Sequence, residues 1–291
     1  MTKREGPVVA VIGGSGLYEI DGLENVTERV LTTPFGAPSD AYVCGELGGV
    51  PMIFLPRHGR GHRISPSEIN FRANIWGLRE LGATQVISVS AVGSMREDIP
   101  PGDFVVIDQF FDRTRHRPDT FFSDGVVAHV MFADPVCSPL RKVLVEACRS
   151  VGVNVHDGGT YINMEGPQFS TRAESRIYRS WGVDVIGMTN LQEAKLAREA
   201  ELCYATVAMS TDYDCWHEEH DDVTVESILE VMSKNVGNAR KVIVDVVPRI
   251  LGGGGECDCA NALENAILTA PDAISPEART RLGLLIDRYL S

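Results

Sequence analysis

Apolar residues along the chain form short runs typical of buried strands, separated by longer segments with helical spacing. Residues 8–12 are a continuous apolar run that ends at a glycine-rich turn. Residues 41–47 and 51–55 flank a Gly-Gly pair and predict a hairpin. Further strands are predicted at residues 85–91, 104–107, 159–163, 184–187 and 204–210.

Capping signals mark the starts of the predicted helices. Ser65 can cap a helix that has Pro66 at its first position and Glu68 completing a capping box. Thr171 and Glu174 form a second box of this kind. The predicted helices run from 65 to about 81, 140 to 150, 171 to about 181 and 191 to 200, with a long helix after 224 and a short one opening at 275.

This alternation predicts an α/β fold in which a parallel or mixed sheet is covered by helices. No boundary divides the chain, so we expect a single domain over residues 1–291 with its core at about 8–250. Residues 252–255 form a glycine-rich break, and the tail that follows carries the pair Cys257 and Cys259.

Charge and composition narrow the classes of partner. Forty acidic against 27 basic residues give a net charge of −13, which argues against nucleic-acid binding but not against a small anion. No apolar run approaches the roughly 20 residues of a membrane span. The seven cysteines are scattered and no export signal precedes them, so we expect a cytoplasmic protein.

Two segments could bind phosphate. Residues 13–16 (Gly-Gly-Ser-Gly) follow a strand and could bind phosphate through their backbone N–H groups. Glu19 stands where a dinucleotide-binding motif has its last glycine, so this motif is incomplete. The alternative is a tight turn that binds no ligand. In residues 57–63, five of seven side chains are Arg or His. Such a loop directly after an apolar strand can bind an oxyanion, although a solvated basic loop is the alternative.

Other segments could bind a heterocycle or a metal. Asp212 and Asp214 follow a strand and could read an amino-substituted ring, or could simply be surface acids. Phe169 could stack on a flat ring. Residues 217–222 lack the spacing of a zinc-binding His pair, and one Cys-x-Cys without a second pair is a weak indication of zinc, so no metal is expected. The two cysteines could be a strained redox pair or two free thiols, and we favour free thiols in a mobile segment.

Six motifs, in this order and spacing, resemble the 5′-methylthioadenosine phosphorylase branch of the trimeric purine nucleoside phosphorylase family. The resemblance runs from residue 8 to about 250. It implies a mixed sheet distorted towards a barrel, and phosphorolysis of a purine nucleoside in methionine and purine salvage. The motifs lie at 12–18 (IGGSGLY), 56–59 (PRHG), 90–94 (SAVGS), 165–170 (EGPQFS), 187–189 (GMT) and 211–216 (TDYDCW).

The resemblance assigns roles to individual residues. Asp212 would be the catalytic acid facing purine N7, Asp214 would accept from the 6-amino group, Phe169 would stack near the base and Met188 would contact the ribose. Ser170 and Val225 would set specificity, with Ile228, Leu229 and His129 as further candidates for the 5′ pocket. The implied phosphate ligands are Ser15, Arg57, His58, Ser90, Ala91 and Thr189.

The resemblance also sets the alternatives. It implies a homotrimer, or a hexamer joined through Cys257 and Cys259, with inorganic phosphate as co-substrate and no cofactor. A methylthioinosine or 6-oxopurine nucleoside phosphorylase is the nearest rival, against which Asp212 and Asp214 argue. An NAD-dependent oxidoreductase resting on residues 13–16, and a nucleoside-binding module without turnover, are the rivals from other classes.

Overall fold

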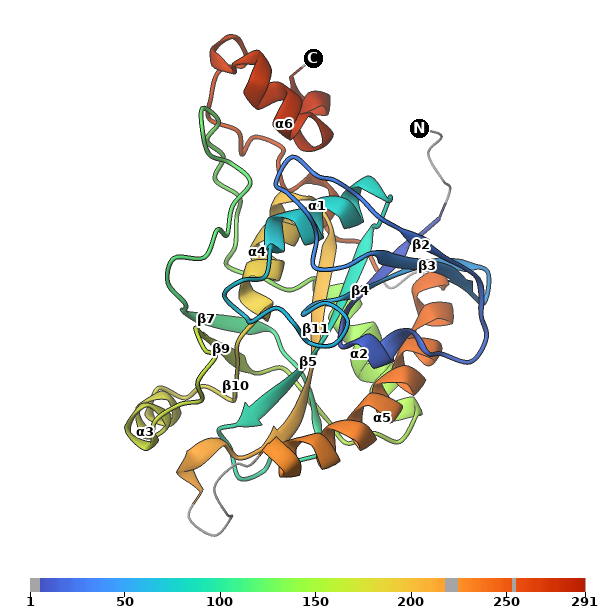
Figure 1. The fold of residues 1–291 in the computed structure, drawn as a ribbon, viewed down its shortest axis with the longest axis vertical. Coiled ribbons are helices and arrows are strands. Elements are labelled where there is room, and N and C mark those ends of the chain that lie inside the picture. Colours follow the sequence, from blue (N-terminus) through green and yellow to red (C-terminus); the bar gives the residue numbers. More distant parts are fainter. Residues whose placement is uncertain (1–5, 218–224, 253–254, 291) are drawn as a thin grey trace.

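The computed structural model describes residues 6–217, 225–252 and 255–290, and the side chains of residue 15 and residues 225–228 lie outside that description. A single mixed sheet runs through the molecule (Figure 1). Its main path has the strand order β2-β3-β4-β1-β5-β10-β9-β7, and β11, β6 and β8 branch from β5. The strands are β1 (Val9–Gly13), β2 (Leu23–Arg29), β3 (Tyr42–Leu47), β4 (Val50–Pro56), β5 (Gln85–Ser94), β6 (Phe104–Val106), β7 (Gln109–Arg113), β8 (Val155–Asp157), β9 (Thr160–Met164), β10 (Val185–Gly187) and β11 (Cys203–Asp212).

Strand β5 is the centre of the sheet because it pairs with three strands. It is parallel to β1 over its first half, parallel to β11 over almost its whole length, and antiparallel to β10 at its end. All of its residues except Gln85 and Ala91 are buried, as expected of a strand covered on both faces. Elements far apart in sequence therefore meet at the carboxyl end of β5.

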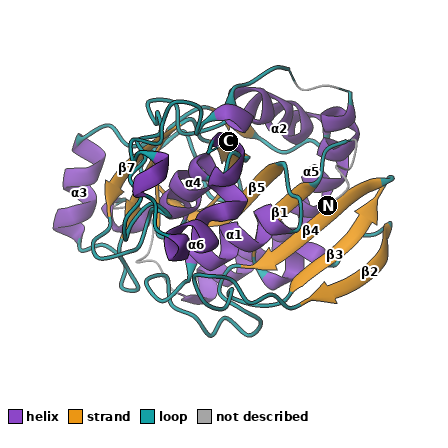
Figure 2. Cartoon of the chain, turned by 90° about the horizontal axis from the view of Figure 1, so that it is seen from above, coloured by secondary structure: helices purple, strands orange, loops and turns teal. Residues whose placement is uncertain are grey.

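Helices cover both faces of the sheet (Figures 1 and 2). One apolar core lies under α2 and α5 and includes Leu144, Val246 and Val207; another lies under α1, α4 and α6 and includes Ile75 and Leu282. The expected α/β domain with a mixed sheet flanked by helices is confirmed. The helices are α1 (Phe71–Glu80), α2 (Ser138–Ser150), α3 (Arg172–Ser180), α4 (Asn190–Glu199), α5 (Val225–Leu251) and α6 (Pro276–Ile286), with short 3-10 turns at Ser15–Tyr18, Asp214–Trp216, Cys259–Asn261, Pro271–Ala273 and Asp287–Tyr289.

The predicted start of the first helix is wrong. Ser65 and Glu68 do bond to one another, but they close only a turn, and α1 begins after Asn70, whose side chain accepts from the Ala73 N–H. The Ser67 hydroxyl instead bonds to the distant Glu165 carboxylate, so a tertiary contact takes this segment out of the helix. The capping box at Thr171 and the cap at Ser275 are confirmed.

Three strands, β2, β7 and β8, were not predicted because their sequences lack an alternation of apolar and polar residues. Strand β2 is exposed over six of its seven residues, β7 is mostly exposed, and β8 has only three residues. None of the helices in the described ranges combines the length and apolar character that crossing a bilayer requires.

Candidate active site

The candidate phosphate residues lie at the carboxyl ends of adjacent parallel strands. Strands β4, β1 and β5 are parallel, with Gly13 opposite Pro56 and Ile12 opposite Ser88. The segment after β4 begins with Arg57, and the turn after β1 contains Ser15. Ligands of open α/β sheets bind at such strand ends. The register therefore places these two loops next to one another, although the Ser15 side chain is outside the described part.

Arg57 lies beneath this edge and is almost fully buried. Its Nε is 2.5 Å from Glu193 Oε1, and its Nη2 donates to Ser88 Oγ at 2.6 Å. Its Nη1 donates to the Val89 carbonyl at 3.0 Å. Nη1 makes no other bond to the described residues, so its second N–H is left for an anion. The ion pair neutralises the buried guanidinium and fixes its orientation.

The Ser90 hydroxyl is buried and makes no hydrogen bond of acceptable geometry to the described residues. The side chain is only 6% exposed, so its lack of a hydrogen bond is costly unless a ligand supplies one. Ala91 follows on the same strand and is half-buried. Thr189, also buried, is the N-cap of α4, and the start of a ten-residue helix favours an anion.

His58 is held in one tautomer. Its Nδ1 lies 2.8 Å from the Ile64 carbonyl oxygen, which can only accept, so Nδ1 carries the proton. Burial lowers the pKa of His58 to about 4, and the nearby Arg57 charge acts in the same direction. The ring is therefore neutral near pH 7, and its Nε2 accepts a hydrogen bond rather than donating one. It suits the protonated oxygen of a hydrogen phosphate.

Asp212 lies at the end of β11, opposite Gly93 of β5. Its Oδ1 accepts from the Asp214 N–H at 2.8 Å, and its Oδ2 lies 2.7 Å from the Thr211 hydroxyl. Burial raises the pKa of Asp212 above its ordinary value, although these two hydrogen bonds oppose the change. A side chain at position 93 would come within 3.0 Å of Asp212 Oδ1, so glycine leaves the room that the carboxylate occupies.

Thr211 can serve Asp212 in both protonation states. Its hydroxyl lies 3.2 Å from the Val92 carbonyl as well as beside Asp212 Oδ2, and it has one proton. When Asp212 is ionised, that proton points to the carboxylate. When Asp212 is protonated, the hydroxyl can accept from the acid and donate to Val92.

Asp214 is the second buried carboxyl of the segment, with a left-handed backbone φ of 52°. Its Oδ2 accepts from the hydroxyl of Ser175 in α3. Burial raises the pKa of Asp214 to about 6, with the Asp212 charge contributing and the bond from Ser175 opposing. At neutral pH the side chain is mainly ionised and can only accept hydrogen bonds. The prediction that the two acids lie near the strand end is confirmed.

The loop that carries Phe169 is tied to Met188 by Arg117. Arg117 is buried and donates through Nη1 to the Met188 carbonyl at 2.5 Å, while its Nε pairs with the Glu165 carboxylate at 2.8 Å. The bonds hold the backbone of Met188 in place. Phe169 itself is 56% exposed, and the Ser170 carbonyl accepts from the Cys215 thiol at 3.3 Å.

The remaining predicted residues are not gathered into this site within the described part of the chain. His129 is exposed and lines a surface cavity of about 730 Å³ that also contains Met131 and Cys257. Leu229 on α5 is 61% exposed. The side chains of Val225 and Ile228 lie outside the described residues, so their roles stay predictions.

Several residues of the site were missed by sequence reasoning. Glu193 and Ser88 hold Arg57, Ser175 holds Asp214, and Arg117 holds Met188. No local pattern marks Glu193, because six of the ten residues of α4 are polar or charged and the burial of the helix is seen only in the structure.

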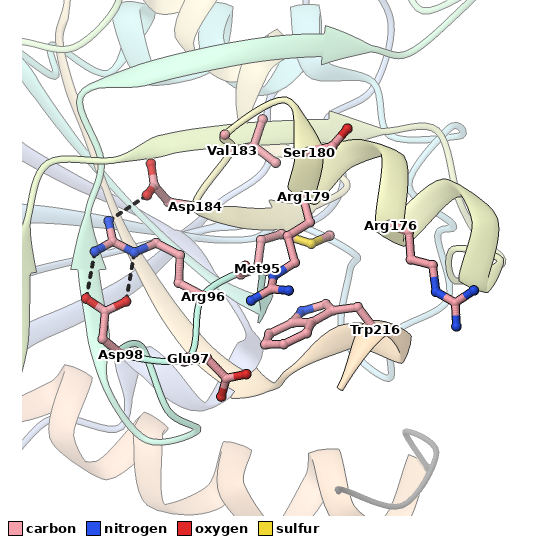
Figure 3. Close-up of a pocket in the computed structure, with 11 residues that line it drawn as sticks. Met95, Arg96, Glu97, Asp98, Arg176, Arg179, Ser180, Val183, Asp184 and Trp216 are labelled. Carbon is pink, nitrogen blue, oxygen red and sulfur yellow. Dashed lines mark hydrogen bonds and ion pairs between the residues drawn. The ribbon is translucent and has the colours of Figure 1, made fainter. Parts of the chain in front are cut away.

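A cavity of about 860 Å³ is lined by Trp216, which belongs to the same 3-10 turn as Asp214, and by residues of α3 and of the segment after β5. In Figure 3, the Arg179 guanidinium lies over the Trp216 ring, 3.9 Å from its centre, and Arg96 pairs with Asp98 and Asp184. The indole Nε1 donates to the Ser94 carbonyl at 2.7 Å. These contacts fix the 3-10 turn that carries Asp214, and none of the predicted ligand-binding residues lines this cavity.

Comparisons with known proteins agree with this geometry. The curated S-methyl-5′-thioadenosine phosphorylase of Geobacter sulfurreducens is 59% identical over 97% of this chain and 99% of its own, and that of Koribacter versatilis is 56% identical over 97% and 96%. A methylthioadenosine phosphorylase crystal structure from an Antarctic soil metagenomic library has a TM-score of 0.93 at 46% identity, covering 97% of this chain and 99% of that one. The family model for the phosphorylase superfamily matches residues 8–248, and the chain belongs to this superfamily.

Proposed function

We propose that this enzyme catalyses the reversible phosphorolysis of S-methyl-5′-thioadenosine, giving adenine and 5-methylthio-α-D-ribose 1-phosphate for methionine and purine salvage. The observation that carries the proposal is that an anion site on β5 and an acid on the neighbouring strand β11 lie along the same part of the sheet. Ser90, with its unpartnered hydroxyl, and Gly93, opposite Asp212, both lie on β5. The relatives bearing this activity's name match the chain over nearly its whole length.

At the phosphate end, no side chain has to attack the sugar because phosphate is the nucleophile. The free N–H of Arg57, the Ser90 hydroxyl and the start of α4 at Thr189 would bind its charged oxygens. Neutral His58 would accept from its protonated oxygen. Ser15 and the backbone of Ala91 complete the proposed set. Phosphate that is bound below the ribose ring attacks C1′ from a fixed position, so the reaction no longer depends on a chance encounter of the two substrates.

At the base end, the leaving purine gains electron density as the C1′–N9 bond breaks. Asp212 would hold or deliver a proton at N7, which its raised pKa favours. Asp214, ionised at neutral pH, would accept from the 6-amino group. Phe169, exposed in the protomer, would stack on the ring.

Between these ends lie the ribose and the methylthio group. The Met188 backbone, fixed by Arg117, would contact the ribose hydroxyls. Ser170 and Val225 are proposed to set the preference at the base and 5′ ends, with Ile228 and Leu229 contributing apolar surface. The reaction needs no cofactor in this scheme, because phosphate supplies the nucleophile and Asp212 the acid.

The decisive assay measures phosphate-dependent release of adenine from methylthioadenosine, in parallel with adenosine, inosine and methylthioinosine. We expect methylthioadenosine to have the highest kcat/KM. Asp212→Ala should reduce kcat by about 10²- to 10⁴-fold, the usual contribution of a general acid. The matched variant Asp272→Ala, at an exposed turn, should retain activity. Faster turnover of methylthioinosine would favour the 6-oxopurine alternative instead.

The proposal includes a homotrimer in which His129 reaches the site of a neighbouring subunit. Support comes from the exposure of His129 away from its own site and from the exposed rings of Phe111 and Trp181, 43% and 49% accessible, which pack against each other at 5.3 Å. Light scattering coupled to size exclusion tests the trimer and would reveal a hexamer. The proposal also places the enzyme in the cytoplasm, and cell fractionation tests this.

A further inference from the structure

Four cysteines from three separate parts of the chain converge beside α2. Their sulfur atoms all lie within 4.8 Å of one another. Cys137 is the N-cap of α2 and Cys203 is the first residue of β11. Cys259 begins the 3-10 turn at Cys259–Asn261, and Cys257 lies two residues before it. Cys257 and Cys259 are free thiols, as expected, but they are not an isolated pair: Cys259 is buried, and Cys137 and Cys203 lie against it.

The geometry fits a metal better than two disulfides. A tetrahedral zinc ion with Zn–S bonds of about 2.3 Å places its four sulfurs about 3.8 Å apart. The Cys203 and Cys257 sulfurs are 3.4 Å apart, and the whole set has its limit at 4.8 Å, whereas a disulfide requires about 2.0 Å. We propose that Cys137, Cys203, Cys257 and Cys259 bind one zinc ion as a structural site with four thiolate ligands.

The surroundings favour the deprotonated ligands that zinc needs. Arg198 is anchored beside the cluster by bonds to the carbonyls of Met131 and Asp134. Four thiolates around Zn²⁺ carry two net negative charges, and a fixed guanidinium next to them offsets one.

The site would connect the C-terminal segment to the core. Cys137 and Cys203 lie at the starts of α2 and β11, which pack against each other, whereas Cys257 and Cys259 belong to the segment after residue 255. That segment also bonds to the loop of His129: the His129 N–H donates to the Ala266 carbonyl, and the Leu268 N–H to the Val127 carbonyl. A metal at the cluster therefore stabilises the base of a loop that the proposed trimer uses. The zinc proposal itself does not depend on the trimer.

Elemental analysis and thiol titration of the full-length protein test the site directly. Protein produced in zinc-supplemented medium and purified without chelator should contain one zinc per chain. After denaturation with a chelator, all seven cysteines should react with a thiol reagent. Protein without zinc that shows three reactive thiols would have two disulfides instead and would overturn the proposal.

Variants locate the metal. Cys257 is exposed, so Cys257→Ser should fold normally while its zinc affinity falls by more than about 100-fold, beyond the loss expected for an outer-shell group. Cys44→Ser, in β3 and outside the cluster, should keep one zinc per chain. Full zinc retention by both Cys257→Ser and the double variant Cys257→Ser/Cys259→Ser would refute the assignment.

Cobalt substitution provides a readout of geometry that is independent of activity. Co²⁺ in a tetrahedral thiolate site gives intense visible ligand-field bands and thiolate charge-transfer bands. The wild type and Cys44→Ser should show both sets of bands, and Cys257→Ser should show weakened charge transfer. A pink protein with the spectrum of octahedral Co²⁺ would contradict a four-thiolate site in the wild type. The rate of phosphorolysis is measured in all three proteins, so that a failure of the zinc proposal can be told apart from a failure of the proposed function.

Discussion

Arg57 Nε and Glu193 Oε1 are 2.5 Å apart, and both side chains are at least 97% buried. Removing one partner of a buried ion pair strands the other charge away from water. Glu193→Ala should therefore lower the free energy of unfolding by about 3–5 kcal/mol, measured by urea unfolding at a fixed subunit concentration.

Two comparisons control this measurement. Glu230→Ala, at an exposed position of α5, should change stability by less than about 0.5 kcal/mol. Arg57→Ala should mainly raise the KM for phosphate, because it removes the anion contact as well as the pair. An unaltered phosphate KM in that variant would argue against a phosphate-binding role for Arg57.

Ser88 and Ser90 lie on the same face of β5 two residues apart, yet only the Ser88 hydroxyl makes hydrogen bonds of good geometry to the described residues. The Ser88 hydroxyl bonds to Arg57, Glu193 and Asn190, so Ser88→Ala should cost about 1–3 kcal/mol of stability. Ser90→Ala should leave stability unchanged and raise the KM for phosphate by about tenfold or more, the loss of one bond to a charged ligand. Steady-state kinetics at varied phosphate concentration and thermal unfolding measure these two effects separately in each variant. Equal stability losses in both variants would mean that Ser90 has a structural partner after all.

Asp214→Asn should shift the preference from 6-aminopurines towards 6-oxopurines. An ionised carboxylate accepts from an amino group but has no proton for O6, whereas the amide can donate. The ratio of kcat/KM for methylthioinosine to that for methylthioadenosine should rise at least about tenfold. If the ratio stays constant while both values fall, Asp214 does not read position 6.

The pKa of Asp214 predicts a pH dependence. Because the pKa is raised to about 6, the carboxylate that accepts from the amino group is present above pH 6 and is lost as the pH falls through 6. kcat/KM for methylthioadenosine should therefore decline on the acid side of pH 6. Ser175→Ala removes a hydrogen bond that lowers this pKa, so the acid limb should move to higher pH. A limb that stays in place would assign the titration to another group.

The strand ends and the loops that follow them were predictable because each is a local pattern. Residues 57–63 and 211–216 combine a buried strand with polar residues immediately after it, and the register then brings them to one edge of the sheet. The helix at Thr171 was predictable for the same reason, since a capping box acts within four residues.

The supporting residues were not predictable, because their partners are distant in sequence. Glu193 is 136 residues from Arg57, and Ser175 is 39 residues from Asp214. The cysteine cluster is the clearest case: Cys257 and Cys259 were judged as a lone pair, and the other two cysteines approach only through the packing of α2 on β11. Local patterns cannot report a pairing that the tertiary fold creates.

The course of β5 also defines a length. A strand rises about 3.3 Å per residue, so the Cα atoms of Ser90 and of Gly93, the residue opposite Asp212, lie about 10 Å apart along β5. A rigid inhibitor that joins a phosphate mimic to a purine mimic must match this span. Shortening or lengthening its linker by two bonds should lose the contact at one end, because the paired strands β5 and β11 cannot stretch to follow.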